Sequence, residues 1–220
     1  YKNDALDSGL HYQFTNNKTD LNALGAPVAA VSDQKQTLTA YAKYKMDNYF
    51  VNAELTHNFG SKDYDNALTT DQDYDSWAGM LQVGGKFDAL TPSLMYFYAQ
   101  GHDTTETDID NALSTSGISA GTGDLFEPLY ILTGRHTGLL NNDLFDAVGD
   151  NWSMKKSGVH AVVAAADYAV SNQLTLHGAI GWAKADEVQT LNQDDEYGWE
   201  YNVGAAYKLL DNLTYEAHFG

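Results

Sequence analysis

Charged side chains recur at alternate positions of several segments whose intervening residues are apolar. Lys43 and Lys45 lie on the two sides of Tyr44. Glu54 follows the same pattern in the next segment. Ammonium and carboxylate groups that share one polar face can solvate ions and polar solutes in a watery channel. We therefore predict that the following set lines a pore: Lys43, Lys45, Glu54, Lys86, Glu200, Lys208 and Glu216.

The elements that would position these charges are β-strands, because the side chains alternate with a period of two. In the segment 37–46, apolar side chains at even positions alternate with threonine, tyrosine and lysine at odd positions. Successive side chains of a strand point to opposite faces, so such a segment has one apolar and one polar face. The pattern predicts about nine strands, at 9–14, 37–46, 49–59, 77–87, 94–101, 159–170, 174–182, 199–209 and 213–220.

The connections between these strands alternate between short and long. Tight turns are expected near 47–48, 88–92, 171–173 and 211–212, and long loops at about 15–34, 60–75, 102–156 and 184–196. All short turns then lie at one end of the strands, which is typical of an up-and-down transmembrane β-barrel. We predict one all-β, antiparallel barrel domain over 1–220, with about nine visible strands of about 12–18 in total and both ends of the protein missing.

Aromatic residues gather near the ends of the apolar faces, where rings with one apolar and one wet side prefer a membrane interface. Many other positions on those faces are alanine or glycine, although a packed soluble core would need larger side chains. Both features favour a surface that faces lipid. A soluble extracellular β-protein, such as a β-sandwich, stays open as an alternative, because it also alternates apolar and polar residues.

A Y-K-x-x-D-N-L-x-Y pattern occurs within 196–220, where it consists of Tyr207, Lys208, Asp211, Asn212, Leu213 and Tyr215. With this pattern the segment resembles the hairpin near the C-terminus of Gram-negative outer-membrane porin-like proteins. It is especially similar to porin-like and alginate-export-like barrels. The resemblance implies a bacterial outer-membrane location, contacts with the lipid bilayer and lipopolysaccharide, passage of small hydrophilic solutes or ions, and often a homotrimer. The terminal aromatic signal of such proteins is absent, as expected for a piece of a longer barrel.

The longest connection, 102–156, exceeds what a plain loop needs and contains apolar runs, so we expect it to fold onto another part of the protein. One hypothesis is that part of 124–148 constricts the pore and places four residues at the aperture: Arg135, His136, Glu127 and Asp143. Arg135 is the single arginine of the chain. The alternative is that this loop packs on the rim of the barrel or on a neighbouring subunit.

The chain carries 30 acidic and 12 basic side chains, which gives a formal net charge of −18 at pH 7. This balance excludes nucleic acid as a partner, because phosphate binding needs a basic face. The charges assigned to strands roughly cancel, so the acidic excess is expected in loops and turns. Acidic loops would either enrich cations at the mouth of a pore or bridge lipopolysaccharide through divalent cations.

Three aspartates, Asp71, Asp73 and Asp75, follow the D-x-D-x-D spacing that begins a calcium-binding loop. The glycine and glutamate that complete such a loop are absent, so the alternative to a loop-bound Ca²⁺ is a solvated acidic loop. The seven histidines show no metal-ligand spacing, and neither a serine-hydrolase elbow nor a phosphate-binding loop occurs. We therefore expect no enzyme activity and no cofactor beyond such a calcium ion.

Together these patterns predict an outer-membrane porin that allows passive diffusion of small hydrophilic solutes or ions through a water-filled barrel. Two alternatives stay open, namely a structural or adhesive barrel with a closed lumen and a soluble extracellular β-protein. Conductance across a lipid bilayer separates the porin from both.

Overall fold

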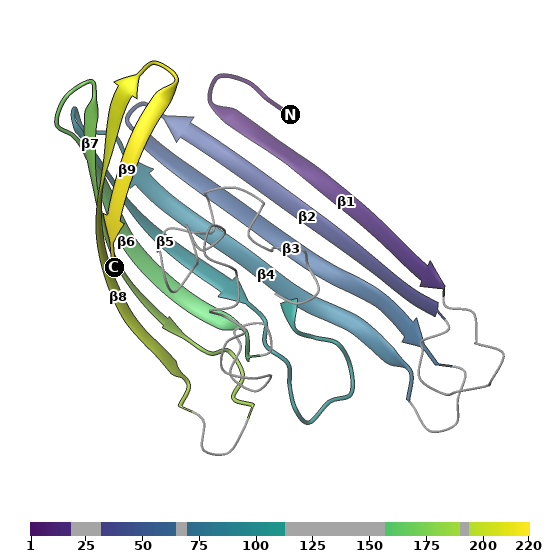
Figure 1. The fold of residues 1–220 in the computed structure, drawn as a ribbon. Helices are drawn as coiled ribbons and strands as arrows, with labels where there is room; N and C mark the ends of the chain where they lie inside the picture. The colour runs from purple at the N-terminus through teal and green to yellow at the C-terminus, as the bar shows by residue number, and fades with distance from the viewer. Residues whose placement is uncertain (19–31, 65–69, 113–156, 190–193) are drawn as a thin grey trace.

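The protein forms one antiparallel β-sheet of nine strands (Figure 1). This computed structural model describes residues 1–18, 32–64, 70–112, 157–189 and 194–220. The strands are β1 (Leu6–Lys18), β2 (Ser32–Met46), β3 (Tyr49–Asp63), β4 (Gln72–Gly85), β5 (Leu90–Ala99), β6 (Val159–Ala169), β7 (Leu174–Lys184), β8 (Glu196–Leu210) and β9 (Leu213–Phe219). None of the described residues belongs to a helix that is long and apolar enough to cross a membrane.

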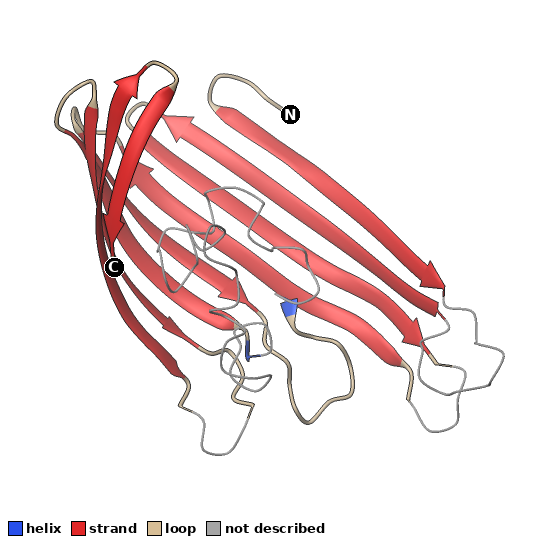
Figure 2. Cartoon of the chain, viewed as in Figure 1, coloured by secondary structure: helices blue, strands red, loops and turns tan. Residues whose placement is uncertain are grey.

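The strands follow one another in the sheet in the same order as in the sequence, and each is antiparallel to the next. Figures 1 and 2 show this up-and-down arrangement and the strong curvature of the sheet. Among the described strands, β1 and β9 each pair on one side only and form the two edges. The predicted nine strands and their up-and-down order are therefore confirmed, and the described sheet is open.

The tight turns lie where the sequence predicts them. The β2–β3 turn contains Asp47, whose φ of 50° is left-handed, and the β4–β5 connection contains Asp88 with a φ of 52°. Aspartate and asparagine tolerate this conformation better than most residues. β5 begins at Leu90 rather than 94, so this connection is shorter than expected.

Several strands extend further toward the long connections than the apolar alternation suggests. β2 begins at Ser32 rather than 37, β3 ends at Asp63 rather than 59, and β4 begins at Gln72 rather than 77. The added residues are mostly polar, and the ladder continues through them, since Ser32 pairs with Asp63. Alternation between apolar and polar residues reveals only the half-apolar part of a strand, so it does not predict these extensions.

The strand register divides the side chains between two faces. The outer face carries large apolar side chains that are exposed, among them Leu10, Tyr44, Leu55, Leu81, Leu94, Ile180, Trp199 and Val203. The inner face carries the side chains that alternate with these, among them Thr39, Glu54, Asn58, Ser76, Met80, Phe97, Val163 and Asn202. Several polar side chains of the inner face are buried, whereas the largest apolar side chains of the outer face are not.

An apolar cluster occupies the inner face of β4 to β7. Its larger members, each at most 6 % exposed, are Met80, Met95, Phe97 and Val163. Met80 pairs with Phe97, and Met95 pairs with Val163, so the four side chains come from adjacent rows. The sequence does not assign faces to 94–101 and 159–170, because both alternating sets are apolar there. The register shows that Met95 and Phe97 point inward.

Candidate functional site

The inner face of β2, β3 and β4 carries a ladder of hydrogen-bonded polar side chains. Thr37 Oγ1 donates to Asn58 Oδ1 at 2.8 Å, and Asn58 Nδ2 donates to Ser76 Oγ at 3.0 Å. Asn58 and Ser76 are fully buried. One row further along the strands, the hydroxyls of Thr39 and Thr56 lie 2.9 Å apart. This network therefore ties three neighbouring strands together through neutral groups.

A second polar row crosses β3, β4 and β5. Asn52 Nδ2 donates to Gln82 Oε1 at 2.8 Å, and Gln82 Nε2 lies 3.4 Å from Ser93 Oγ. None of these neutral residues is among the predicted site residues, which are all charged or histidine. The period of two that places Glu54 inward also places Asn52 inward, so the signal was present in the sequence.

Six of the seven charged residues predicted to line a pore lie on the inner face by the register of their strands. They are Lys43, Lys45, Glu54, Glu200, Lys208 and Glu216. The seventh, Lys86, follows the end of β4 and lies in the connection to β5, where its amide donates to the Asn48 carbonyl at 2.7 Å. The six form two groups near the two edges of the sheet, one on β2 and β3 and the other on β8 and β9.

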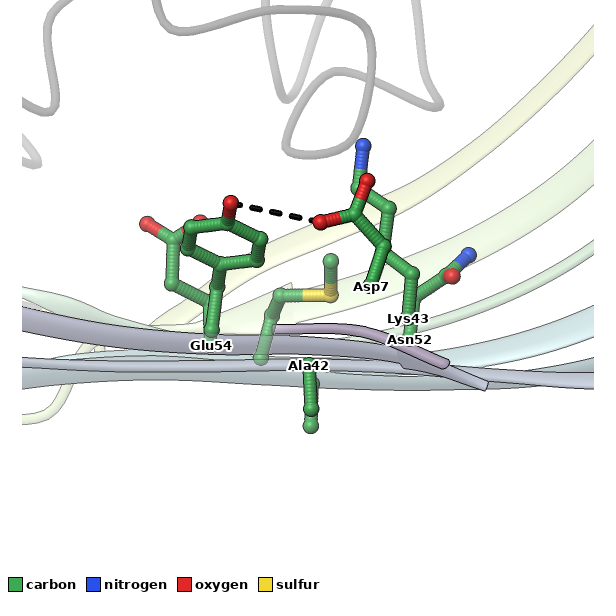
Figure 3. Close-up of a pocket in the computed structure, with 8 residues that line it drawn as sticks. Asp7, Ala42, Lys43, Asn52 and Glu54 are labelled. Carbon is green, nitrogen blue, oxygen red and sulfur yellow. Dashed lines mark hydrogen bonds between the residues drawn. The ribbon is translucent and has the colours of Figure 1, made fainter. Parts of the chain in front are cut away.

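The structure does bring Lys43 and Glu54 to one cavity of about 220 Å³. The cavity is lined by Asp7, Tyr41, Ala42, Lys43, Asn52, Ala53, Glu54 and Met80. Figure 3 shows the side chains of Asp7, Lys43 and Glu54 on one side of the sheet, whereas Ala42 points to the other. The Tyr41 hydroxyl donates to Asp7 Oδ1 at 3.4 Å. The cavity thus combines charges of both signs, and neither Asp7 nor Tyr41 is among the residues predicted from the sequence.

A second group of inner-face polar residues lies on β6, β7 and β8. Glu200 and Asn202 are only 5 % and 3 % exposed, and Asn202 Nδ2 donates to Glu200 Oε1 at 3.3 Å. His177 Nδ1 lies 2.7 Å from Asp167 Oδ1 on the neighbouring strand. A buried carboxylate such as Glu200 is costly without polar partners, so the amide beside it stabilises it.

The outer face carries aromatic rings at both ends of the strands. Near the short turns lie Tyr44, Tyr49, Phe87, Tyr168, Tyr207 and Tyr215, and near the long connections lie Trp77, Tyr96, Trp182 and Trp199. Trp199 and Tyr207 are eight residues apart on one strand, which corresponds to about 26 Å along the strand and to about 20 Å of height at a tilt of about 40°. The apolar band between the rings therefore has nearly the height of a transmembrane barrel's apolar band, about 25 Å.

The aromatic residues near the long connections are joined to polar groups. His57 stacks on Trp77 with ring centroids 4.0 Å apart, and its Nε2 lies 2.9 Å from Asp75 Oδ1. Two strands away, His160 Nδ1 lies 2.7 Å from the Tyr96 hydroxyl. His160 Nε2 lies 2.8 Å from a carboxylate oxygen of Asp186. These rings have one apolar and one hydrogen-bonded side, as aromatic residues at a membrane interface do.

The described beginning of the connection 102–156 packs back against β4. The Ile109 amide donates to the Asp73 carbonyl at 2.7 Å, and the Asp73 amide donates to Asp108 Oδ1 at 3.0 Å. Ala112 is fully buried and belongs to the apolar cluster of the inner face. This part of the connection therefore folds onto the sheet. The four residues of the constriction hypothesis, Arg135, His136, Glu127 and Asp143, lie outside the described residues.

Acidic side chains gather where this connection meets the one after β7. Asp186 Oδ2 accepts a hydrogen bond from the Gly101 amide at 2.9 Å, and Asp110 Oδ1 lies 2.6 Å from His102 Nδ1. Burial raises the pKa of Glu187 above its ordinary value, and nearby carboxylates raise it further. The neighbours responsible are Asp186, Asp103 and Asp110. Acidic residues therefore lie close together beyond the strand ends, as the sequence charge suggests.

The three aspartates of the calcium motif are separated by the strand. Asp73 and Asp75 belong to β4, and Asp71 Oδ1 accepts a hydrogen bond from the Tyr64 amide at 2.8 Å. An extended chain spaces carboxylates along its length rather than around one point. Among the residues that the structure describes, no group of three or more histidine, aspartate or glutamate side chains is placed to hold a metal ion. The calcium site stays an expectation from the sequence alone.

No protein-family model matches this chain, and a search of curated proteins finds no similar one. Any inference of function therefore rests on the geometry of the sheet. A curved sheet with an exposed apolar outer face and a polar, partly charged inner face can separate lipid from water.

Proposed function

We propose that this chain forms part of a porin-like β-barrel of the bacterial outer membrane, through which small hydrophilic solutes or ions diffuse passively. The observation that carries the proposal is the distribution of side chains between the two faces. Large apolar residues such as Leu55 and Val203 are 53 % and 60 % exposed, whereas Asn58 on the inner face is fully buried. Apolar surface left in water is unfavourable by about 25 cal/mol per Å². Lipid would cover it.

The two edges of the sheet would have to be paired for it to span a membrane. In lipid every backbone N–H and C=O group must be paired within protein, so an open sheet cannot span a bilayer. The free edges of β1 and β9 would therefore pair with further strands, in a barrel of about 12–18 strands. We expect the barrel to assemble as a homotrimer, on the resemblance of 196–220 to porin-like barrels.

The polar and charged residues of the inner face would then form the wall of a water-filled lumen. Lys43, Lys45 and Glu54 would contact passing solutes on one side, and Lys208 and Glu216 on the other, whereas Glu200 is buried beside Asn202. The acidic groups around Asp186 would face the outside of the cell at the mouth of the pore. There they would enrich cations, or bridge lipopolysaccharide through divalent cations. The constriction by 124–148 is part of the same proposal.

A second candidate function is a structural or adhesive barrel whose lumen is closed. The specific observation in its favour is the apolar cluster around Met95 and Phe97, because a lumen filled with water would favour polar side chains there. Solute passage separates the two functions. Proteoliposomes containing the protein should swell in isotonic arabinose, and more slowly in a larger sugar such as raffinose. Protein that is folded and inserted but causes no swelling would support the closed barrel instead.

A further inference from the structure

Two adjacent rows of inner-face residues meet at the cavity between β1 and β4. By register, the first row contains Asp7, Lys43 and Asn52, and the second contains Tyr41 and Glu54. Side chains opposite one another on neighbouring strands are close, and diagonal neighbours are about 7–8 Å apart. Lys43 and Glu54 form such a diagonal pair, so a small solute between them can reach both charges.

The other acidic group of the cavity already has partners. Lys2 Nζ lies 3.2 Å from Asp7 Oδ2, and the Tyr41 hydroxyl donates to the other carboxylate oxygen. Lys43 and Glu54 act on each other electrostatically, and neither forms a hydrogen bond with any residue that the structure describes. Among the described residues, the cavity therefore presents one ammonium and one carboxylate that form no hydrogen bond with a neighbour.

The neutral residues give the cavity its size. The Tyr41 ring lies over Gly9 on the edge strand, where a Cβ atom would be only 2.8 Å from Tyr41 Cε1. Met80 provides an apolar surface. Because one water occupies about 30 Å³ of liquid, a volume of about 220 Å³ holds about seven waters or one solute of amino-acid size.

We propose that this cavity is a binding subsite for small zwitterions of amino-acid size, whose ammonium group contacts Glu54 and whose carboxylate contacts Lys43. A simple cation would contact Glu54 without Lys43, and a simple anion would contact Lys43 without Glu54. This inference rests on the proposed function, because the inner face is then the wall of the lumen. Weak, reversible binding on that wall is what passage of a solute requires.

The test is a binding titration of the full chain in detergent micelles, followed by saturation-transfer NMR. The probes are β-alanine, n-propylamine and propionate, which have similar size and differ in charge. We expect saturable binding of β-alanine, and affinities at least about tenfold lower for the singly charged probes, because each lacks one charge-assisted hydrogen bond. Equal affinity for all three probes, or a preference for a singly charged probe, would overturn the proposal.

Variants locate the site. Lys43→Met and Glu54→Gln should each weaken β-alanine binding by at least about tenfold, whereas the double exchange Lys43→Glu with Glu54→Lys should restore it to within about threefold. Lys35→Met is the matched control, because Lys35 lies on the same strand and face but does not line the cavity. Retained binding in both single variants, or loss in the control alone, would contradict the assignment. Circular dichroism checks that each variant keeps its strands.

The titration does not need a channel. Binding of β-alanine without conductance would overturn the porin function and leave the subsite intact. Conductance without β-alanine binding would overturn the subsite and leave the porin function intact.

Discussion

Asn58 on β3 donates a hydrogen bond of 3.0 Å to Ser76 on β4, and both side chains are fully buried on the inner face. The same amide group accepts a hydrogen bond from Thr37 on β2 through its oxygen. One asparagine therefore joins three strands. A buried polar group that loses its partner costs more than the hydrogen bond itself contributes, so this position should be sensitive to substitution.

Replacing Asn58 by leucine should destabilise the protein by about 2–3 kcal/mol, because Thr37 and Ser76 lose a buried partner. The measurement is the midpoint of urea unfolding in detergent micelles. Asn52→Leu is the control, since Asn52 is only half-buried, and it should cost about 1 kcal/mol or less. Equal effects of the two variants would show that burial of the Asn58 network does not matter.

Arginine on the outer face should oppose insertion into lipid. Val203→Arg is expected to cost about 2–4 kcal/mol of folding free energy in a bilayer, because the side chain would face acyl chains. Ala206→Arg on the inner face of the same strand should cost much less. The measurement is the fraction of each variant that folds into liposomes. Folded and heat-unfolded barrels differ in their mobility on gels, so this fraction can be read for both variants. If both variants fold equally well, the outer face does not contact lipid.

The tryptophans near the long connections should lie at the membrane interface. Trp77, Trp182 and Trp199 belong to the outer-face rings of β4, β7 and β8. Lipids brominated near the headgroup should therefore quench their fluorescence more strongly than lipids brominated near the chain ends. Trp152 lies outside the described residues and is replaced by phenylalanine in this experiment. Stronger quenching by deep bromines, or no quenching at all, would contradict the predicted depth.

The contribution of Glu187 to stability should rise as pH falls. The pKa of Glu187 is raised by burial and by neighbouring carboxylates, so the folded state binds the proton more tightly than the unfolded state does. The cost of its charge is present above the folded pKa and disappears as pH falls below the unfolded value. Glu187→Gln should remove this pH dependence and slow amide hydrogen exchange near Glu187 at neutral pH by about twofold to threefold. Faster exchange in the variant would contradict the account.

The strands were predictable because apolar and polar side chains alternate along the sequence wherever only one face of a strand is apolar. Leu38 and Tyr44 on β2 alternate with threonine and lysine, and the predicted face of each is the observed one. Where both faces are apolar, as around Met95 and Val163, alternation carries no information. There the hydrogen-bond register decides the faces, and the sequence does not reveal it.

The candidate site was predictable only in part. Charged residues such as Lys43 and Glu54 were identified by type and spacing, and the register places both inward. The cavity between them also needs Asp7 and Tyr41, which lie far apart in the sequence and meet through the pairing of β1 with β2. Local patterns do not encode such cross-strand neighbours. The calcium motif at Asp73 shows that a local pattern can also mislead. Its spacing is typical of a loop, but Asp73 and Asp75 lie within β4.

The central claim is that the inner face lines an open pore, and single-channel conductance in a planar bilayer tests it most directly. Protein reconstituted under a KCl gradient should give discrete, ohmic current steps, with a reversal potential that reports a preference for cations. Lys43→Met should shift that potential further toward cations, because it removes a positive charge from the wall. Protein that is folded and inserted but gives no current steps would contradict the account.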